Sequence, residues 1–275
     1  MTSMPQRTKN EVEWQRAASG TDATLPASNP VTQALLGRLP VLPAGSTVMD
    51  LACGTGQPTF VLAQARPSLE VLGVDVTPAM IDEAWLKART NAIKNVRFEV
   101  MSLDRLELAD RSVDGAVSQF GFLQEGDIGA STRELARVLA PGAPFSVAAF
   151  DDMDLNTLMT SIYRALANHV PADTLPDFEY LTRLAAPGLR ERVLREAGLP
   201  HVDSELFRWS VPVPSFEVLW MIASGPIPFA RAMAALDDAG VAKVRSALEA
   251  EVRQYETGNG SYEFPMACRL FVGNN

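Results

Sequence analysis

Two acidic residues and two glycines form the clearest chemical pattern in this sequence. A short apolar run ends at Asp50, and a loop of small residues that contains Gly54 and Gly56 follows it. A helix-like segment comes next, and a second apolar run then ends at Asp75. Glycines let a backbone approach a ligand closely, and an acid at a strand end can accept hydrogen bonds from ribose hydroxyls. The pattern therefore predicts the nucleotide-binding half of a doubly wound sheet.

The details of the loop disfavour a dinucleotide as the ligand. A dinucleotide fingerprint has three glycines, and the third lets the helix pack closely on the strand. With Gly54 and Gly56 as the first two glycines, Thr59 stands at the third position, and in the register two residues earlier Ala52 replaces the first glycine. The sequence therefore gives little support to pyrophosphate binding.

The sequence D-L-A-C-G-T-G at 50–56 resembles motif I of the class I S-adenosylmethionine-dependent methyltransferases. The resemblance covers roughly residues 45–150, where V-R-F-E-V, S-V-D-G-A-V-S and F-S-V-A-A-F resemble the third, fourth and fifth strands. The wording C-G-T-G-Q-P-T and V-D-V-T-P-A-M is similar to the branch that holds ubiquinone/menaquinone-type and many natural-product methyltransferases. The expected fold is α/β: a doubly wound, seven-stranded, mostly parallel sheet with an antiparallel last strand and helical lid insertions.

The resemblance implies S-adenosyl-L-methionine as cofactor. The amino acid end of this cofactor carries an ammonium group, so an acid such as Asp50 near the loop is favourable. Family members commonly read the adenine amine with an Asp after the third strand, but here Ser102 stands at that place and Asp104 follows two positions later. Either side chain could take that role. The cofactor-binding residues that we predict are Asp50, Ala52, Gly54, Gly56, Asp75, Val76, Met80, Ser102, Leu103, Asp104 and Gln119.

Methyl transfer from a sulfonium needs alignment of the acceptor more than a nucleophilic triad. A general base is needed if the acceptor is a hydroxyl or an activated carbon. The candidates are His169, whose imidazole titrates near neutral pH, and Asp151 and Asp152, which directly follow the predicted fifth strand. His169 and His201 have no metal-ligand spacing to a cysteine or an acid, and Cys53 and Cys268 are expected to be reduced and buried.

The pattern of elements predicts a core with two insertions. We expect an N-terminal segment at 1–30, core segments at 31–150, 187–214 and 259–275, and lid insertions at 151–186 and 215–258. Apolar periodicity within the insertions indicates amphipathic helices, and their large apolar side chains predict a mainly apolar acceptor pocket. The predicted acceptor-binding residues are Phe120, Phe122, Tyr163, Trp220 and Phe229.

Composition narrows the range of partners. The 275 residues carry a formal net charge of −9, with 47% hydrophobic and 21% charged residues. An acidic balance argues against nucleic acid and against polybasic membrane attachment. No apolar stretch is long enough to span a membrane, and the first ten residues do not resemble a signal peptide, so a cytoplasmic location is expected.

The predicted function is methyl transfer from S-adenosylmethionine to a small, largely apolar acceptor in specialised metabolism. A second hypothesis is a protein of this fold that binds the cofactor but catalyses a cyclisation or another rearrangement. A third is a binding or regulatory protein that keeps the fold. The sequence separates neither O-, N- and C-methylation nor monomer and homodimer.

Overall fold

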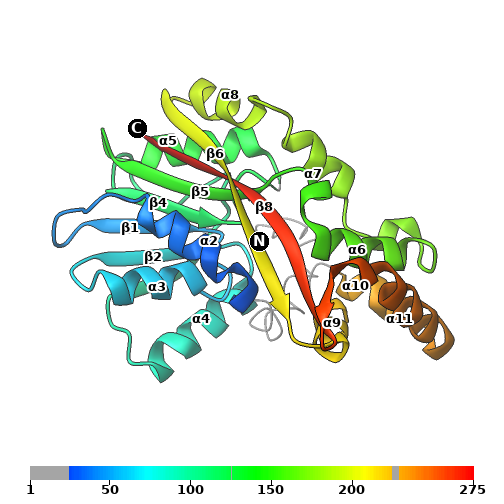
Figure 1. The fold of residues 1–275 in the computed structure, drawn as a ribbon. Coiled ribbons are helices and arrows are strands. Elements are labelled where there is room, and N and C mark those ends of the chain that lie inside the picture. The colour runs from blue at the N-terminus through cyan, green and yellow to red at the C-terminus, as the bar shows by residue number, and fades with distance from the viewer. Residues whose placement is uncertain (1–24, 125, 225–228) are drawn as a thin grey trace, which may run out of the picture.

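The computed structural model describes residues 25–124, 126–224 and 229–275, with side chains from residue 30 onward. Trp14, Pro226 and Pro228, which the sequence singled out as a packing residue and helix breakers, lie outside the described residues. A sheet in the order β3-β2-β1-β4-β5-β8-β6 forms the centre of the molecule, and β7 pairs with β8 as an eighth strand (Figure 1).

Five parallel strands make one side of the sheet, and the long antiparallel pair of β6 and β8 makes the other. The strands β2, β4 and β5 carry nearly continuous buried residues, as expected where helices cover both faces. The strands are β1 (Thr47–Leu51), β2 (Glu70–Asp75), β3 (Val96–Val100), β4 (Gly115–Gln119), β5 (Pro144–Phe150), β6 (His201–Val213), β7 (Glu256–Gly258) and β8 (Ser261–Asn274).

Helices cover both faces of the sheet. One face packs against α2 (Leu25–Gly37), α3 (Gln57–Ala65) and α4 (Pro78–Thr90). The other packs against α5 (Ile128–Val138) and α8 (Leu189–Glu196). This arrangement confirms the predicted doubly wound α/β fold and its antiparallel last strand. The short β7 is the addition to the predicted seven strands, and His201 begins β6 rather than lying in the turn before it.

A helical lobe lies beside the sheet, and both predicted insertions contribute to it (Figure 1). Its core joins buried side chains of the helices to the far ends of β6 and β8, including Val211 and Phe264. Ser215 caps the helix that begins at Phe216, with its hydroxyl accepting from Val218 N. The elements of this region are η2 (Met153–Leu155), α6 (Thr157–Ala167), η3 (Ala172–Thr174), α7 (Phe178–Leu184), α9 (Phe216–Ala223), α10 (Ala230–Ala234), α11 (Asp238–Val252) and η4 (Arg253–Tyr255).

Candidate active site

The loop after β1 is shaped by two glycines that play different roles. Gly54 has a φ of +54°, and an added Cβ would meet nothing within 4 Å. Gly56 has a φ of +92°, and an added Cβ would lie 2.7 Å from Phe60 Cε2 and 3.2 Å from Phe98 Cζ. Gly54 therefore faces open space that a ligand could use, whereas Gly56 is required by packing inside the protein. Gly56 therefore has a packing reason to be glycine, and its predicted role in cofactor binding stays a prediction.

Asp50, the last-but-one residue of β1, is fully buried behind this loop. Its Oδ2 accepts a 2.6 Å hydrogen bond from Thr59 Oγ1, and its Oδ1 has no hydrogen-bond partner among the described residues. Burial raises the pKa of the Asp50 carboxyl to about 7, although the Thr59 hydroxyl lowers it. The third-glycine position of the fingerprint therefore holds a hydroxyl that binds this acid.

Asp75 ends β2 and lies beside the same loop, 9% exposed. Its Oδ2 accepts from Gly54 N at 3.0 Å, and its Oδ1 accepts from Thr77 N at 2.9 Å. Burial raises the pKa of Asp75, and these backbone donors lower it. Each carboxylate oxygen has two lone pairs, so the group can accept further hydrogen bonds from a ligand.

The segment after β3 lies next to the end of β2, because Met101 N donates to Asp75 O at 3.0 Å. Ser102 Oγ donates to Asp104 Oδ1 at 2.6 Å, and both side chains are exposed. Val76 is partly exposed on the same edge, whereas Met80 is buried beneath it. The two candidates for reading an adenine amine are therefore bonded to each other and act as one unit.

The loop after β4 packs directly on the loop after β1. An added Cβ on Gly121 would lie 2.2 Å from Ala52 Cβ, and Ala52 itself has a φ of +54°. Ser118, in β4, ties the two strands together because its hydroxyl donates to Leu51 O and accepts from Phe122 N. The structure thus brings the end of β4, and with it Gln119, against the glycine loop.

Gln119 is fixed from outside the sheet. The Thr32 hydroxyl of α2 donates to Gln119 Oε1 at 2.7 Å. Thr32 is buried, and nothing in the sequence near it signals a role at this edge. Contacts of this kind join segments that are far apart in the chain, so sequence spacing alone could not reveal them.

The three candidate bases do not come together. Asp151 is buried at the end of β5, where its Oδ2 forms an ion pair with Arg269 Nε at 2.8 Å. Asp152 caps η2 through a bond from Asp154 N. His169 is exposed beyond the C-terminal end of α6, so the full length of that helix separates it from the end of β5. The structure therefore favours structural roles for the two acids and gives His169 no place beside the strand ends.

The predicted acceptor-binding residues divide into two groups. Phe120 stacks on Phe150 with ring centroids 4.2 Å apart, and Tyr163 stacks on Phe178 at 4.8 Å. Phe122 and Phe229, by contrast, are fully buried core residues, because each packs within a hydrophobic cluster.

Trp220 is partly buried but is occupied by a neighbouring helix. The Arg245 guanidinium of α11 lies 5.4 Å from its ring centroid. The sequence identified Trp220, like Phe122 and Phe229, as a large apolar side chain. It did not show which part of the protein would cover that side chain.

A cavity of about 350 Å³ lies in the helical lobe and includes the Tyr163–Phe178 pair. Its volume falls within the usual range for small-molecule pockets. The charged groups on its lining are paired: Arg164 lies 3.9 Å from Asp154 and 3.3 Å from Glu251, and Glu179 lies 2.9 Å from Arg183. The cavity is lined by Met153, Asp154, Thr160, Tyr163, Arg164, Phe178, Glu179 and Thr182.

Two negative findings bear on the described residues. No helix among them is both long and apolar enough to cross a membrane. Nor do they contain a cluster of three or more His, Cys, Asp or Glu residues suited to holding a metal ion.

Residues 48–142 match the family model described as a methyltransferase domain. The chain is 32% identical over 123 residues to a demethylmenaquinone methyltransferase from Deinococcus radiodurans, which covers 45% of this chain and 50% of that protein. The chain thus spans about half the length of the curated relatives it matches.

Solved structures share the fold over most of the chain. A putative methyltransferase from an antibiotic biosynthesis pathway of Anabaena variabilis aligns with a TM-score of 0.62 and 19% identity, covering 89% of this chain and 96% of that one. The [4+2]-cyclase SpnF aligns with a TM-score of 0.56 and 20% identity, covering 90% and 81% respectively. At these identities the likeness concerns the fold.

Proposed function

We propose that this chain, whose residues 48–142 match a methyltransferase domain, is a class I S-adenosylmethionine-dependent methyltransferase that transfers a methyl group to a small, neutral, largely apolar acceptor. The observation that carries this proposal is the pairing of Asp75 with Gly54 at the carboxyl edge of β1 and β2. There a carboxylate with spare acceptor capacity lies beside a loop position with open space around it.

The residues at this edge fit the cofactor that the family uses. Asp75 can accept from the ribose hydroxyls, and Asp50 holds a buried carboxylate oxygen without a partner that suits an ammonium group. The cofactor supplies a methyl group that is already electrophilic. The protein's part is therefore to bind, orient and exclude water, and positioning of this kind can supply roughly 7–11 kcal/mol of the barrier.

Proton removal remains a separate question for this site. Of the three candidate bases, Asp151 and Asp152 are held by Arg269 and by η2, and His169 is exposed at the far end of α6. We therefore propose catalysis by positioning, in which a hydroxyl acceptor loses its proton to solvent rather than to one of these three side chains. Near-normal kcat in His169→Gln, Asp151→Asn and Asp152→Asn would support this, and a loss of about 10²–10⁴-fold in one variant would identify a base.

The cavity beside Tyr163 and Phe178 supports the choice of acceptor class. Its aromatic pair offers flat apolar surface, and the charged groups on its lining have opposite charges nearby. A charged acceptor would have to compete with these pairs, whereas a neutral ring would not. We propose that this activity belongs to specialised metabolism, since the motifs C-G-T-G-Q-P-T and V-D-V-T-P-A-M resemble the branch that holds ubiquinone/menaquinone-type and many natural-product methyltransferases.

The test is release of S-adenosylhomocysteine from S-adenosylmethionine with a charge series on one ring: 1,4-naphthohydroquinone and 1-naphthol, 1-naphthylmethylamine and 1-naphthoate. We expect turnover with the neutral members. Phe178→Ala should raise the KM of the acceptor, whereas Met221→Ala, which removes an exposed side chain, should not.

Two outcomes would contradict the proposed methyl transfer, and each would favour a different hypothesis. Cofactor binding with no methylated product from any acceptor would favour the cyclisation hypothesis. Failure to bind the cofactor would favour a binding or regulatory protein.

A further inference from the structure

Arg190 is the largest fully buried side chain among the described residues, and no step of the proposed function uses it. It lies in the first turn of α8, and 2% of its surface is exposed. Burial lowers the pKa of its guanidinium to about 10, so the group stays charged at neutral pH. A buried charge is costly unless its hydrogen bonds are made, so the contacts of Arg190 need an explanation.

The guanidinium joins two loops of the active-site edge. Nε donates to Leu123 O at 3.1 Å, and Nη1 donates to Phe150 O at 2.7 Å. Leu123 follows β4 and Phe150 ends β5. Gln124 makes the reverse connection, because its Oε1 accepts from Phe150 N. The donors of a planar guanidinium form a rigid fork. The side chain therefore fixes the distance between the two carbonyl groups as well as placing a positive charge beside them.

The loops joined by Arg190 carry the aromatic pair at this edge. Phe120 and Leu123 have φ values of +60° and +64°, a region that non-glycine residues seldom occupy. Backbone of this kind persists only where its surroundings hold it. The Phe120 ring lies on the Phe150 ring at 4.2 Å with 8° between the planes, and the Trp209 ring lies 6.3 Å from Phe120.

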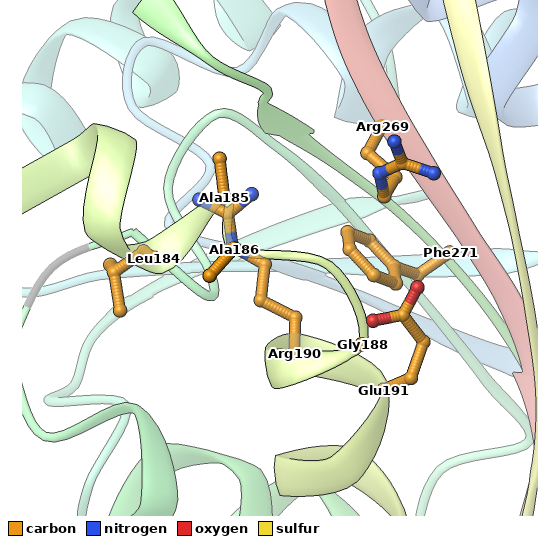
Figure 2. Close-up of a pocket in the computed structure, with 8 residues that line it drawn as sticks. All are labelled: Leu184, Ala185, Ala186, Gly188, Arg190, Glu191, Arg269 and Phe271. Atoms are coloured by element: carbon orange, nitrogen blue, oxygen red, sulfur yellow. The ribbon is translucent and has the colours of Figure 1, made fainter.

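An ion pair does not account for Arg190. Asp151 is the largest favourable charge acting on it, but the carboxylate of Asp151 is bonded to Arg269. The Nη2 atom of Arg190 has no hydrogen-bond partner among the described residues. Arg190 and Arg269 line one cavity of about 10 Å³, enough for about one water (Figure 2). The bonds that the side chain makes to protein are therefore the two to the loop carbonyls.

We propose that Arg190 is a positioning residue for methyl transfer. It holds the loops after β4 and β5 in the arrangement that stacks the Phe120 ring on the Phe150 ring. The inference rests on the proposed function for its kinetic part only. Arg190 acts from the opposite face of the sheet, since α8 packs with α5 and not with the helices beside the glycine loop.

The test compares Arg190→Met with Arg192→Met, which makes the same change at an exposed position of the same helix. The full chain is labelled with 5-fluorotryptophan, and the ¹⁹F signal of Trp209 is followed beside those of Trp14, Trp85 and Trp220. Thermal unfolding, S-adenosylhomocysteine affinity by calorimetry, and kcat with the best acceptor of the naphthalene series complete the measurements.

We expect Arg190→Met to move the Trp209 signal and to lower kcat per folded molecule on the order of 100-fold, with a much smaller change in cofactor affinity. Arg192→Met should resemble the wild type throughout. If Arg190→Met does not fold, Arg190→Lys keeps the charge but not the fork, and it should show the same two changes in weaker form.

A wild-type Trp209 signal and normal kcat in the folded variants, with only thermal stability lost, would overturn the proposal. Absence of turnover in the wild type would contradict the proposed function alone. The Trp209 signal would then still decide whether Arg190 sets the loops.

Discussion

At the scale of single residues, burial controls the chemistry of the acidic pair. Asp50 and Asp75 both lie where water is largely excluded, and burial raises the pKa of both carboxyls. Their partners differ, however. Asp50 has one hydroxyl donor and an oxygen without a partner, whereas Asp75 has two backbone donors. We therefore expect Asp50 to affect the pH dependence of stability and Asp75 to affect cofactor affinity.

The first prediction concerns the pH dependence of stability. The folded protein holds the Asp50 proton to about pH 7, and an unfolded chain releases it near pH 3.9. Between these values the folded state binds more protons, so the free energy of unfolding falls as the pH rises and levels off above pH 7. The loss should be on the order of 4 kcal/mol in wild type.

Asp50→Asn should flatten this slope, as measured by urea unfolding from pH 4 to pH 8. Asp75 contributes in the same direction in both proteins and cancels in the comparison. Asp104→Asn, at an exposed site, is the control and should keep the wild-type slope. Equal slopes in Asp50→Asn and wild type would contradict the assignment.

The second prediction concerns cofactor affinity. Asp75→Ala should weaken S-adenosylhomocysteine binding by roughly 1.5–3 kcal/mol, the range for hydrogen bonds to a charged group. Asp114 is a matched control, because its carboxylate also accepts a backbone N–H, from Thr47, at the opposite end of β1. Calorimetry should show normal binding in Asp114→Ala, and equal effects in the two variants would argue against a ligand role for Asp75.

At the scale of elements, the two glycines of the turn from β1 to α3 are expected to differ in role, one affecting mainly stability and the other mainly ligand binding. Gly56 has both a left-handed φ and a blocked Cβ direction, whereas Gly54 has a left-handed φ but open space. Ligand contact and internal packing thus fall on neighbouring glycines of one loop. A larger residue at Gly56 is therefore expected to disturb the fold, since its Cβ would meet Phe60.

The third prediction uses this difference. Gly56→Ala should lower the free energy of unfolding by roughly 1–3 kcal/mol, because it adds backbone strain and a clash. Gly54→Ala should cost less stability, because a φ of +54° lies in the left-handed region open to other residues, but it should weaken cofactor binding more. Chemical unfolding and calorimetry on both variants provide the measurements, and the reverse order would contradict the division of roles.

At the scale of the whole molecule, the long antiparallel pair of β6 and β8 joins the sheet to the helical lobe. Its inner half pairs with β5, and its outer half enters the core of α6, α9 and α11 (Figure 1). A lobe built on continuous strands is poorly suited to swing as one lid. By contrast, α7 buries only Leu184, so it is the element of the cavity lining that can move at the least cost in contacts.

The fourth prediction is that hydrogen exchange separates α7 from the rest of the lobe. Amides of α6 and of the outer ends of β6 and β8 should be protected nearly as well as the central strands, and those of residues 178–184 should exchange faster. Cofactor together with acceptor should slow exchange in α7. Uniformly fast exchange across 151–186 and 215–258 would instead support a lid that includes both insertions.

The sequence by itself determined the local units and their order. Apolar runs that end in Asp50 and Asp75, with glycines between them, can form little other than strand, turn, helix and strand, because turn chemistry and periodicity are local. The amphipathic helices of the two insertions were predictable for the same reason.

Only the tertiary structure decided which side chains face a ligand and which face the protein. Phe122 and Phe229 are buried in the core, and a Cβ added at Gly56 would contact Phe60. Asp151 forms an ion pair with Arg269, a residue far along the chain. Thr32 and Arg190 reached the active-site edge from other elements without any motif to mark them. Periodicity shows that a residue is apolar on one face, but the partner on that face is set by how distant segments pack.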